Sequence, residues 1–124
     1  MNKMKRIVFG WAAVPVLLTP LAVATPAQAA FSDCPSGKFC LFSAPRGAGV
    51  LATYSTGDVN LGDDIGPQGM NNNTESMWNR TSDTWCVWDG TGYQGGLVAL
   101  MPAGQKIDVM STNTENRISS LKRC

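Results

Sequence analysis

The residues of this 124-residue chain that could do covalent or metal chemistry are its four cysteines, Cys34, Cys40, Cys86 and Cys124. The chain contains no histidine. A Ser-His-Asp triad, a Cys-His pair and a histidine-ligated zinc site are therefore excluded. No Cys-x-x-Cys spacing occurs, which argues against zinc, and no imidazole is present to activate a catalytic thiol. The cysteines are therefore interpreted as structural.

A second candidate for chemistry is the pair Asp63-Asp64, which lies in a glycine-rich stretch, residues 62–69. Two adjacent carboxylates could bind a cation or act in acid–base chemistry. Charges of this kind are more often solvated in a loop, and no other carboxylate pair suggests an active site. The sequence therefore predicts that the protein is not an enzyme.

The first 29 residues are interpreted as a secretory signal peptide that is removed. Three basic residues within the first six precede an apolar stretch, residues 7–24. The pattern Ala27-x-Ala29 then predicts cleavage after Ala29. A membrane anchor is the alternative, but Pro15, Pro20 and the cleavage pattern favour removal. We expect a secreted, soluble product.

The remaining chain, residues 30–124, has 95 residues and carries seven basic and nine acidic side chains, a net charge of −2. Its length allows a single domain. A mildly acidic surface makes nucleic acid and anionic lipid poor partners. We therefore expect a monomer that binds neither nucleic acid nor membrane.

The mature chain consists of two similar halves. Residues 39–49 align with residues 85–95 at an offset of 46, which places cysteine over cysteine, aromatic over aromatic and Gly49 over Gly95. Later in each half, residues 72–77 align with residues 115–120 at an offset of 43. Two blocks in the same order favour a duplicated motif. We place the first motif at about 34–81 and the second at about 82–124.

The local signals predict β-structure throughout. Short runs rich in branched, aromatic or alternating residues cover 38–42, 50–54, 84–88, 97–101, 106–110 and 117–122. Glycine and asparagine clusters separate them, and no sustained helical period occurs. The pattern predicts an all-β sandwich of antiparallel sheets. Its expected core draws on aromatics, one face per strand: Phe39, Phe42, Trp78, Trp85, Trp88 and Tyr93.

An even number of cysteines in a small secreted domain predicts two disulfides. We favour Cys34–Cys40, since Cys34 precedes the first strand across a Pro-Ser-Gly turn, and Cys86–Cys124, since Cys124 ends the last strand. By chain entropy these bridges contribute about 2 and about 4 kcal/mol. Four cysteines allow three pairings, so the other two stay open.

These residues carry a family resemblance. The pattern Trp88-x-x-x-x-Tyr93-x-Gly95, followed by Ser119-Ser120, resembles a βγ-crystallin Greek-key motif. In that family the aromatics flank a folded hairpin, the glycine takes a positive φ and the serine caps the hairpin. The first half matches at Phe42 and Gly49, while Gly47 stands where the second aromatic belongs.

Together with the signal peptide, the segment Cys-Pro-Ser-Gly-Lys-Phe-Cys at 34–40 and the final Lys-Arg-Cys resemble the secreted actinobacterial, streptomycete-type metalloproteinase inhibitors. That resemblance covers 34–124 and implies inhibition of thermolysin-like metalloproteases. It also implies a reactive Cys–Val bond, which here is Cys86-Val87. The same residues also read as an ordinary strand, and the loops 43–48 and 89–92 are alternative binding edges.

The resemblance implies a possible calcium site in each half, because many βγ-crystallin domains bind calcium through Asn/Asp-Asn/Asp-x-x-Ser/Thr-Ser. The matching residues are Asn72, Asn73, Ser76, Asn116, Ser119 and Ser120. Both copies depart from the pattern, at Met77 and at Glu115, and asparagine turns that satisfy their own backbone explain the same residues. We expect that no cofactor is required.

A non-inhibitory role is the alternative. The same fold could serve as a calcium-stabilised structural domain or as a cell-wall-directed antimicrobial protein. Inhibition requires a protease target, the structural domain would melt at a higher temperature with calcium, and the antimicrobial would stop growth without any protease.

Overall fold

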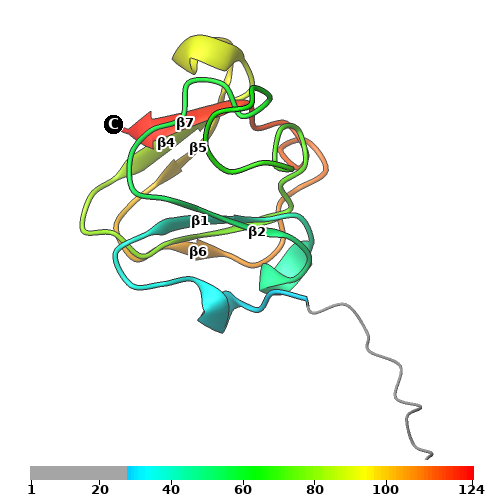
Figure 1. Cartoon of the computed structure of the whole chain (residues 1–124), viewed down its shortest axis with the longest axis vertical. Coiled ribbons are helices and arrows are strands. Elements are labelled where there is room, and N and C mark those ends of the chain that lie inside the picture. The colour runs from blue at the N-terminus through cyan, green and yellow to red at the C-terminus, as the bar shows by residue number, and fades with distance from the viewer. Residues whose placement is uncertain (1–27) are drawn as a thin grey trace, which may run out of the picture.

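The computed structural model describes residues 28–124 and shows two antiparallel sheets packed face to face (Figure 1). The strands are β1 (Phe39–Phe42), β2 (Leu51–Tyr54), β3 (Ser76–Asn79), β4 (Trp85–Trp88), β5 (Leu97–Met101), β6 (Lys106–Ile107) and β7 (Ser120–Arg123). Short 3₁₀ turns form η2 (Phe31–Asp33), η3 (Pro45–Gly47) and η4 (Thr91–Tyr93). The predicted all-β sandwich is therefore confirmed.

Most of the predicted signal peptide, residues 1–27, lies outside the described residues. Within residues 28–124, no helix is long and apolar enough to cross a membrane.

The two halves of the chain exchange one segment each between the sheets. The first sheet has the order β2-β1-β3-β6, and the second has the order β5-β4-β7. Strand β6 of the second half pairs with β3 of the first, with Met77 opposite Ile107. In return Asp58 pairs with Leu121 of β7 through reciprocal backbone hydrogen bonds of 2.8 and 3.0 Å. Each sheet therefore requires residues from both halves.

The core lies between the sheets and is centred on two equivalent aromatics of the two halves. Phe39 and Trp85 are fully buried and stack with ring centroids 4.9 Å apart. Because side chains alternate along a strand, Phe42 points the other way and is buried in a second cluster with Cys34 and Cys40. The other expected core aromatics, Trp78, Trp88 and Tyr93, are only partly buried.

Several strand boundaries differ from the sequence-based expectation. Strand β3, Ser76–Asn79, was not among the expected runs, since its polar ends resemble the asparagine-rich turn before it. Strand β6 stops at Ile107 rather than residue 110, and β7 begins at Ser120 rather than residue 117. Both segments are shortened because the chain leaves the sheet to form the turns around residues 111–116.

The predicted disulfides are confirmed. Cys34 is bonded to Cys40 and Cys86 is bonded to Cys124, across sequence separations of 6 and 38 residues. The first bridge ties the N-terminal segment to β1, and the second ties β4 to the C-terminal end of the chain.

Candidate functional site

The predicted reactive bond lies inside the fold. Cys86 and Val87 are in the middle of β4, which is hydrogen-bonded to β5 on one side and to β7 on the other. Val87 is 0% exposed and Cys86 is 7% exposed. A protease cleft receives an accessible segment, so the folded protein does not present this bond. The assignment of Cys86-Val87 as the reactive bond stays a prediction, and the burial of Val87 argues against it.

The alternative binding edges are two hairpins that are built in the same way. In the first, which joins β1 to β2, Ser76 Oγ accepts a hydrogen bond from Gly47 N at 2.9 Å and donates to Ala44 O at 2.6 Å. In the second, which joins β4 to β5, Ser120 Oγ accepts from Tyr93 N at 3.0 Å and donates to Gly90 O at 2.6 Å. We call these the first and second capped hairpins, residues 43–50 and 89–97.

The caps correct the alignment of the two halves. Ser76 and Ser120, which are 44 residues apart, each donate a hydrogen bond that caps a hairpin. Asn72 and Asn116, which are also 44 residues apart, both have a positive φ, 53° and 56°. The expected offset of 43, which paired Ser76 with Ser119, is therefore wrong by one residue. The error arose because two adjacent serines in the second half offered two registers, and the hydrogen bonds select the later one.

The second capped hairpin is further held by charge. Asp89 Oδ1 accepts a hydrogen bond from Gly96 N at 2.7 Å, and Asp89 Oδ2 forms an ion pair with Arg117 at 3.0 Å. Gly95 has a φ of 83°, and a Cβ at this position would lie 2.4 Å from Asp89 Oδ1. Glycine is therefore required there by both backbone conformation and space.

The missing aromatic of the first hairpin is supplied from another part of the chain. A Cβ on Gly47 would lie 2.6 Å from Phe31 Cγ, so Phe31 of η2 occupies the space beside it. The Phe31 ring packs edge-on against Phe42 at 5.1 Å, much as Tyr93 packs against Trp88 at 5.5 Å. The sequence analysis missed Phe31 because it precedes the aligned blocks, and the one available signal was the unexplained Gly47.

Exposed apolar side chains gather beside the second capped hairpin. Strand β5 is an outer strand of its sheet, and its Leu97 and Leu100 are 52% and 53% exposed. An outer strand that carries apolar side chains is a typical surface for an extended partner segment. The second hairpin and β5 therefore form the most prominent candidate contact surface.

Most side chains that match the calcium pattern are already engaged in hydrogen bonds within the protein. The hydroxyls of Ser76 and Ser120 are used by the hairpin caps, and Ser119 Oγ donates to Asn72 Oδ1 at 3.1 Å. Asn73 Nδ2 donates to Gly69 O at 2.8 Å.

In contrast, Asn116 Oδ1 and Thr74 Oγ1 are buried without a hydrogen-bond partner. Two oxygens fall short of the six or more that calcium takes in proteins. The calcium site therefore stays a prediction, which most of these contacts do not favour.

Comparison with known proteins identifies the family. The sequence model of peptidase inhibitor family I36 matches residues 27–100. The chain belongs to peptidase inhibitor family I36. Membership supports a non-enzymatic protein whose partner is a peptidase, as the sequence predicts. No curated protein matches the chain.

Solved structures show the fold of this I36 protein. One solved structure, described under the words "Evolution of the eye lens beta-gamma-crystallin domain fold", is similar with a TM-score of 0.65 at 14% identity. The match covers 73% of this chain and 89% of that one. A βγ-crystallin from Ciona intestinalis has a TM-score of 0.60 at 23% identity, covering 71% and 100%. An archaeal βγ-crystallin has a TM-score of 0.57 at 15% identity, covering 73% and 100%. The predicted βγ-crystallin-like fold is confirmed.

Proposed function

We propose that this I36 protein is a secreted inhibitor of extracellular, thermolysin-like metalloproteases. The observation that carries the proposal is the family match over residues 27–100, and the resemblance of 34–124 to metalloproteinase inhibitors supplies the target class. Two disulfides are typical of proteins from an oxidising compartment. Cleavage after Ala29 would leave the new α-ammonium at the Ala30 nitrogen, which lies 2.8 Å from Asp33 Oδ2.

The second capped hairpin and β5 are the surface that we assign to the protease. The Ser120 cap and the Asp89–Arg117 ion pair hold this hairpin in one conformation, which lowers the entropic cost of binding. Leu97 and Leu100 offer apolar side chains to an apolar protease pocket. The first capped hairpin has the same kind of cap but is followed by a strand without two exposed leucines.

The experiment is an inhibition titration of the disulfide-bonded protein, purified after export, against a thermolysin-type metalloprotease, with a serine protease as the control enzyme. We expect stoichiometric inhibition of the metalloprotease alone. Absence of inhibition at micromolar protein, or equal inhibition of both enzymes, would show that the target class is wrong.

A matched pair of variants tests the surface. Leu97→Lys is expected to weaken inhibition about tenfold or more, because it removes an apolar contact from the centre of the interface. Val50→Lys is the control, since Val50 is 51% exposed and is the last residue of the first capped hairpin instead. If Leu97→Lys inhibits like the parent, the surface assignment fails while the inhibitor proposal stands.

A further inference from the structure

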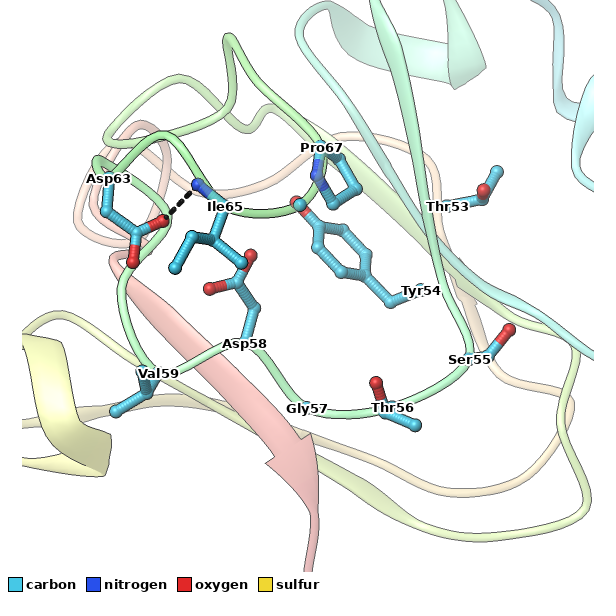
Figure 2. A pocket seen from close by; sticks show the side chains of 11 residues that line it. Thr53, Tyr54, Ser55, Thr56, Gly57, Asp58, Val59, Asp63, Ile65 and Pro67 are labelled. Carbon is cyan, nitrogen blue, oxygen red and sulfur yellow. Dashed lines mark hydrogen bonds between the residues drawn. The ribbon is translucent and has the colours of Figure 1, made fainter.

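A pocket is formed by the C-terminal end of β2, the segment that follows it and part of the glycine-rich stretch, residues 62–69. Residues 53–59, 63 and 65–67 line it, and its volume is about 290 Å³. Figure 2 shows the Tyr54 ring reaching from β2 toward Pro67, with the Asp58 side chain pointing to the same loop segment. The pocket adjoins the second capped hairpin, because Gly92 N donates a hydrogen bond to Val59 O at 2.8 Å, but none of its lining residues belongs to that hairpin or to β5.

Two buried polar atoms in this pocket have no partner. Tyr54 is only 3% exposed, and its hydroxyl forms no hydrogen bond. Asp58 Oδ2 is also buried without a partner, although Asp58 Oδ1 accepts a hydrogen bond from Asn60 N at 3.1 Å. A buried polar group without a hydrogen-bond partner destabilises the folded state, and a charged one does so more strongly. A ligand that donates hydrogen bonds to both atoms would recover that loss.

The pocket is negatively charged on its loop side. Asp63 lines it together with Asp58, and Asp63 Oδ1 accepts a hydrogen bond from Ile65 N at 3.0 Å. Burial raises the pKa of the Asp58 carboxyl, the bond from Asn60 N opposes that rise, and the charge of Asp63 adds to it. Burial, and then the charge of Asp58, raises the pKa of Tyr54, so its hydroxyl stays protonated.

The nearby cationic side chains are engaged elsewhere. Lys38 contacts Ser55 Oγ, and Arg123 donates to Ser55 O at 2.7 Å while it pairs with Asp83 at 2.8 Å. Lys122 Nζ lies over the Tyr93 ring at 4.4 Å. Among residues 28–124, no ion pair involves Asp58 or Asp63. The carboxylates of the pocket are therefore not neutralised by the protein's own cations.

Apolar side chains form a further part of the lining, beside the hydroxyl residues Thr53, Ser55 and Thr56. Ile65 is 76% exposed, and Val59 and Pro67 also line the pocket. An anionic interior behind apolar side chains suits a positive group carried on a short alkyl chain. Among the described residues, no three His, Cys, Asp or Glu side chains gather where they could hold a metal ion.

We propose that this pocket binds a primary ammonium group on a short alkyl chain, with Asp58 Oδ2 and the Tyr54 hydroxyl accepting its N–H donors. Asp63 adds long-range attraction, and Ile65 and Val59 contact the alkyl carbons. The ammonium group could belong to a free alkylamine or to a lysine side chain, and both share the same chemistry. No lining residue belongs to the surface assigned to the protease, and n-butylammonium binding is measured without any protease, so either proposal can fail alone.

The test is an NMR titration of the exported, disulfide-bonded protein with n-butylammonium, following the backbone amides of Gly57, Ile65 and Gly66. We expect saturable shifts at these amides. Tetramethylammonium, which has charge but no N–H donor, and n-butanol, which has no charge, are expected to bind at least about tenfold more weakly. A Lys-containing tripeptide with blocked ends forms the second arm, and its binding or failure to bind distinguishes a side chain from a free amine.

Variants tie the binding to the two acceptors. Asp58→Asn keeps the bond from Asn60 and is expected to weaken n-butylammonium binding about tenfold or more. Tyr54→Phe removes only the hydroxyl and serves as the second variant if Asp58→Asn does not fold. Asp64→Asn, exposed and outside the lining, is the charge-matched control. Absence of saturable binding, or unchanged affinity in both pocket variants, would overturn the proposal.

Discussion

Phe39 and Trp85, which occupy equivalent positions in the two halves, stack with their ring planes 17° apart. Each is fully buried, and each belongs to the central strand region of a different sheet. The two copies of the duplicated motif therefore contact each other through the same position of the motif. The contact joins the sheets at the middle of the core.

Phe39→Ala is expected to lower the free energy of unfolding by about 3–5 kcal/mol, since it removes a fully buried ring and leaves a cavity beside Trp85. Denaturant unfolding followed by tryptophan fluorescence measures this change. Phe31→Ala, in the partly exposed outer cluster, is expected to cost less. An equal loss for both variants would mean that the core is not centred on the Phe39–Trp85 pair.

The two hairpin serines provide a symmetric comparison. Ser76→Ala and Ser120→Ala each leave one backbone N–H and one carbonyl without their partner, so each is expected to cost about 1–3 kcal/mol of stability. Protease titrations should separate them, because only Ser120 holds the hairpin that we assign to the interface. Inhibition reduced equally by both variants would contradict that assignment.

The position of any cleaved bond can be read by mass spectrometry. After prolonged incubation with the target protease, hydrolysis at Cys86-Val87 would add one water to the mass, and the Cys86–Cys124 bridge would keep both fragments together until reduction. We expect no cleavage at this bond, because Val87 is fully buried in the middle of β4. Fragments ending at Cys86 after reduction would establish the reactive bond despite its burial.

The raised pKa of Asp58 predicts that the stability of the folded protein depends on pH. Burial raises the folded-state pKa of Asp58 above its ordinary value of 3.8, so the folded protein binds a proton more readily than the unfolded chain. The destabilisation by the Asp58 charge is therefore present above the folded pKa and disappears as the pH falls toward the unfolded value. Asp58→Asn should raise the Tm at neutral pH, with the advantage shrinking in acid. A difference in Tm that does not change with pH would contradict this.

Calcium is expected to change the Tm by less than about 2 °C at millimolar concentration, since weak or absent binding contributes little by mass action. The hydroxyls of Ser76 and Ser120 are already used in the hairpin caps. Thermal melts with calcium and with a chelator measure the shift. A rise of several degrees that the chelator reverses would restore the calcium prediction and direct attention to Asn116 and Thr74.

Local sequence patterns were sufficient for several features of this protein. The sequence favoured the observed disulfide pairing, because the cysteines lie beside turns and strand ends, and the glycine turns predicted where the hairpins lie. The turns and the Cys34–Cys40 bridge depend on residues close together in the chain, whose allowed conformations are restricted by their own side chains, whereas the Cys86–Cys124 bridge spans 38 residues. The family resemblance rested on the same short-range spacings.

Tertiary packing alone decided the rest. The exchange of β6 and Asp58 between the halves, and the insertion of Phe31 beside Gly47, join residues that no local pattern links. Packing also buried Val87, whose segment is compatible with either an exposed reactive bond or a central strand. It left the Tyr54 hydroxyl and Asp58 Oδ2 facing one pocket without hydrogen-bond partners. Burial and hydrogen-bond satisfaction depend on which distant segments meet, and only the folded chain determines that.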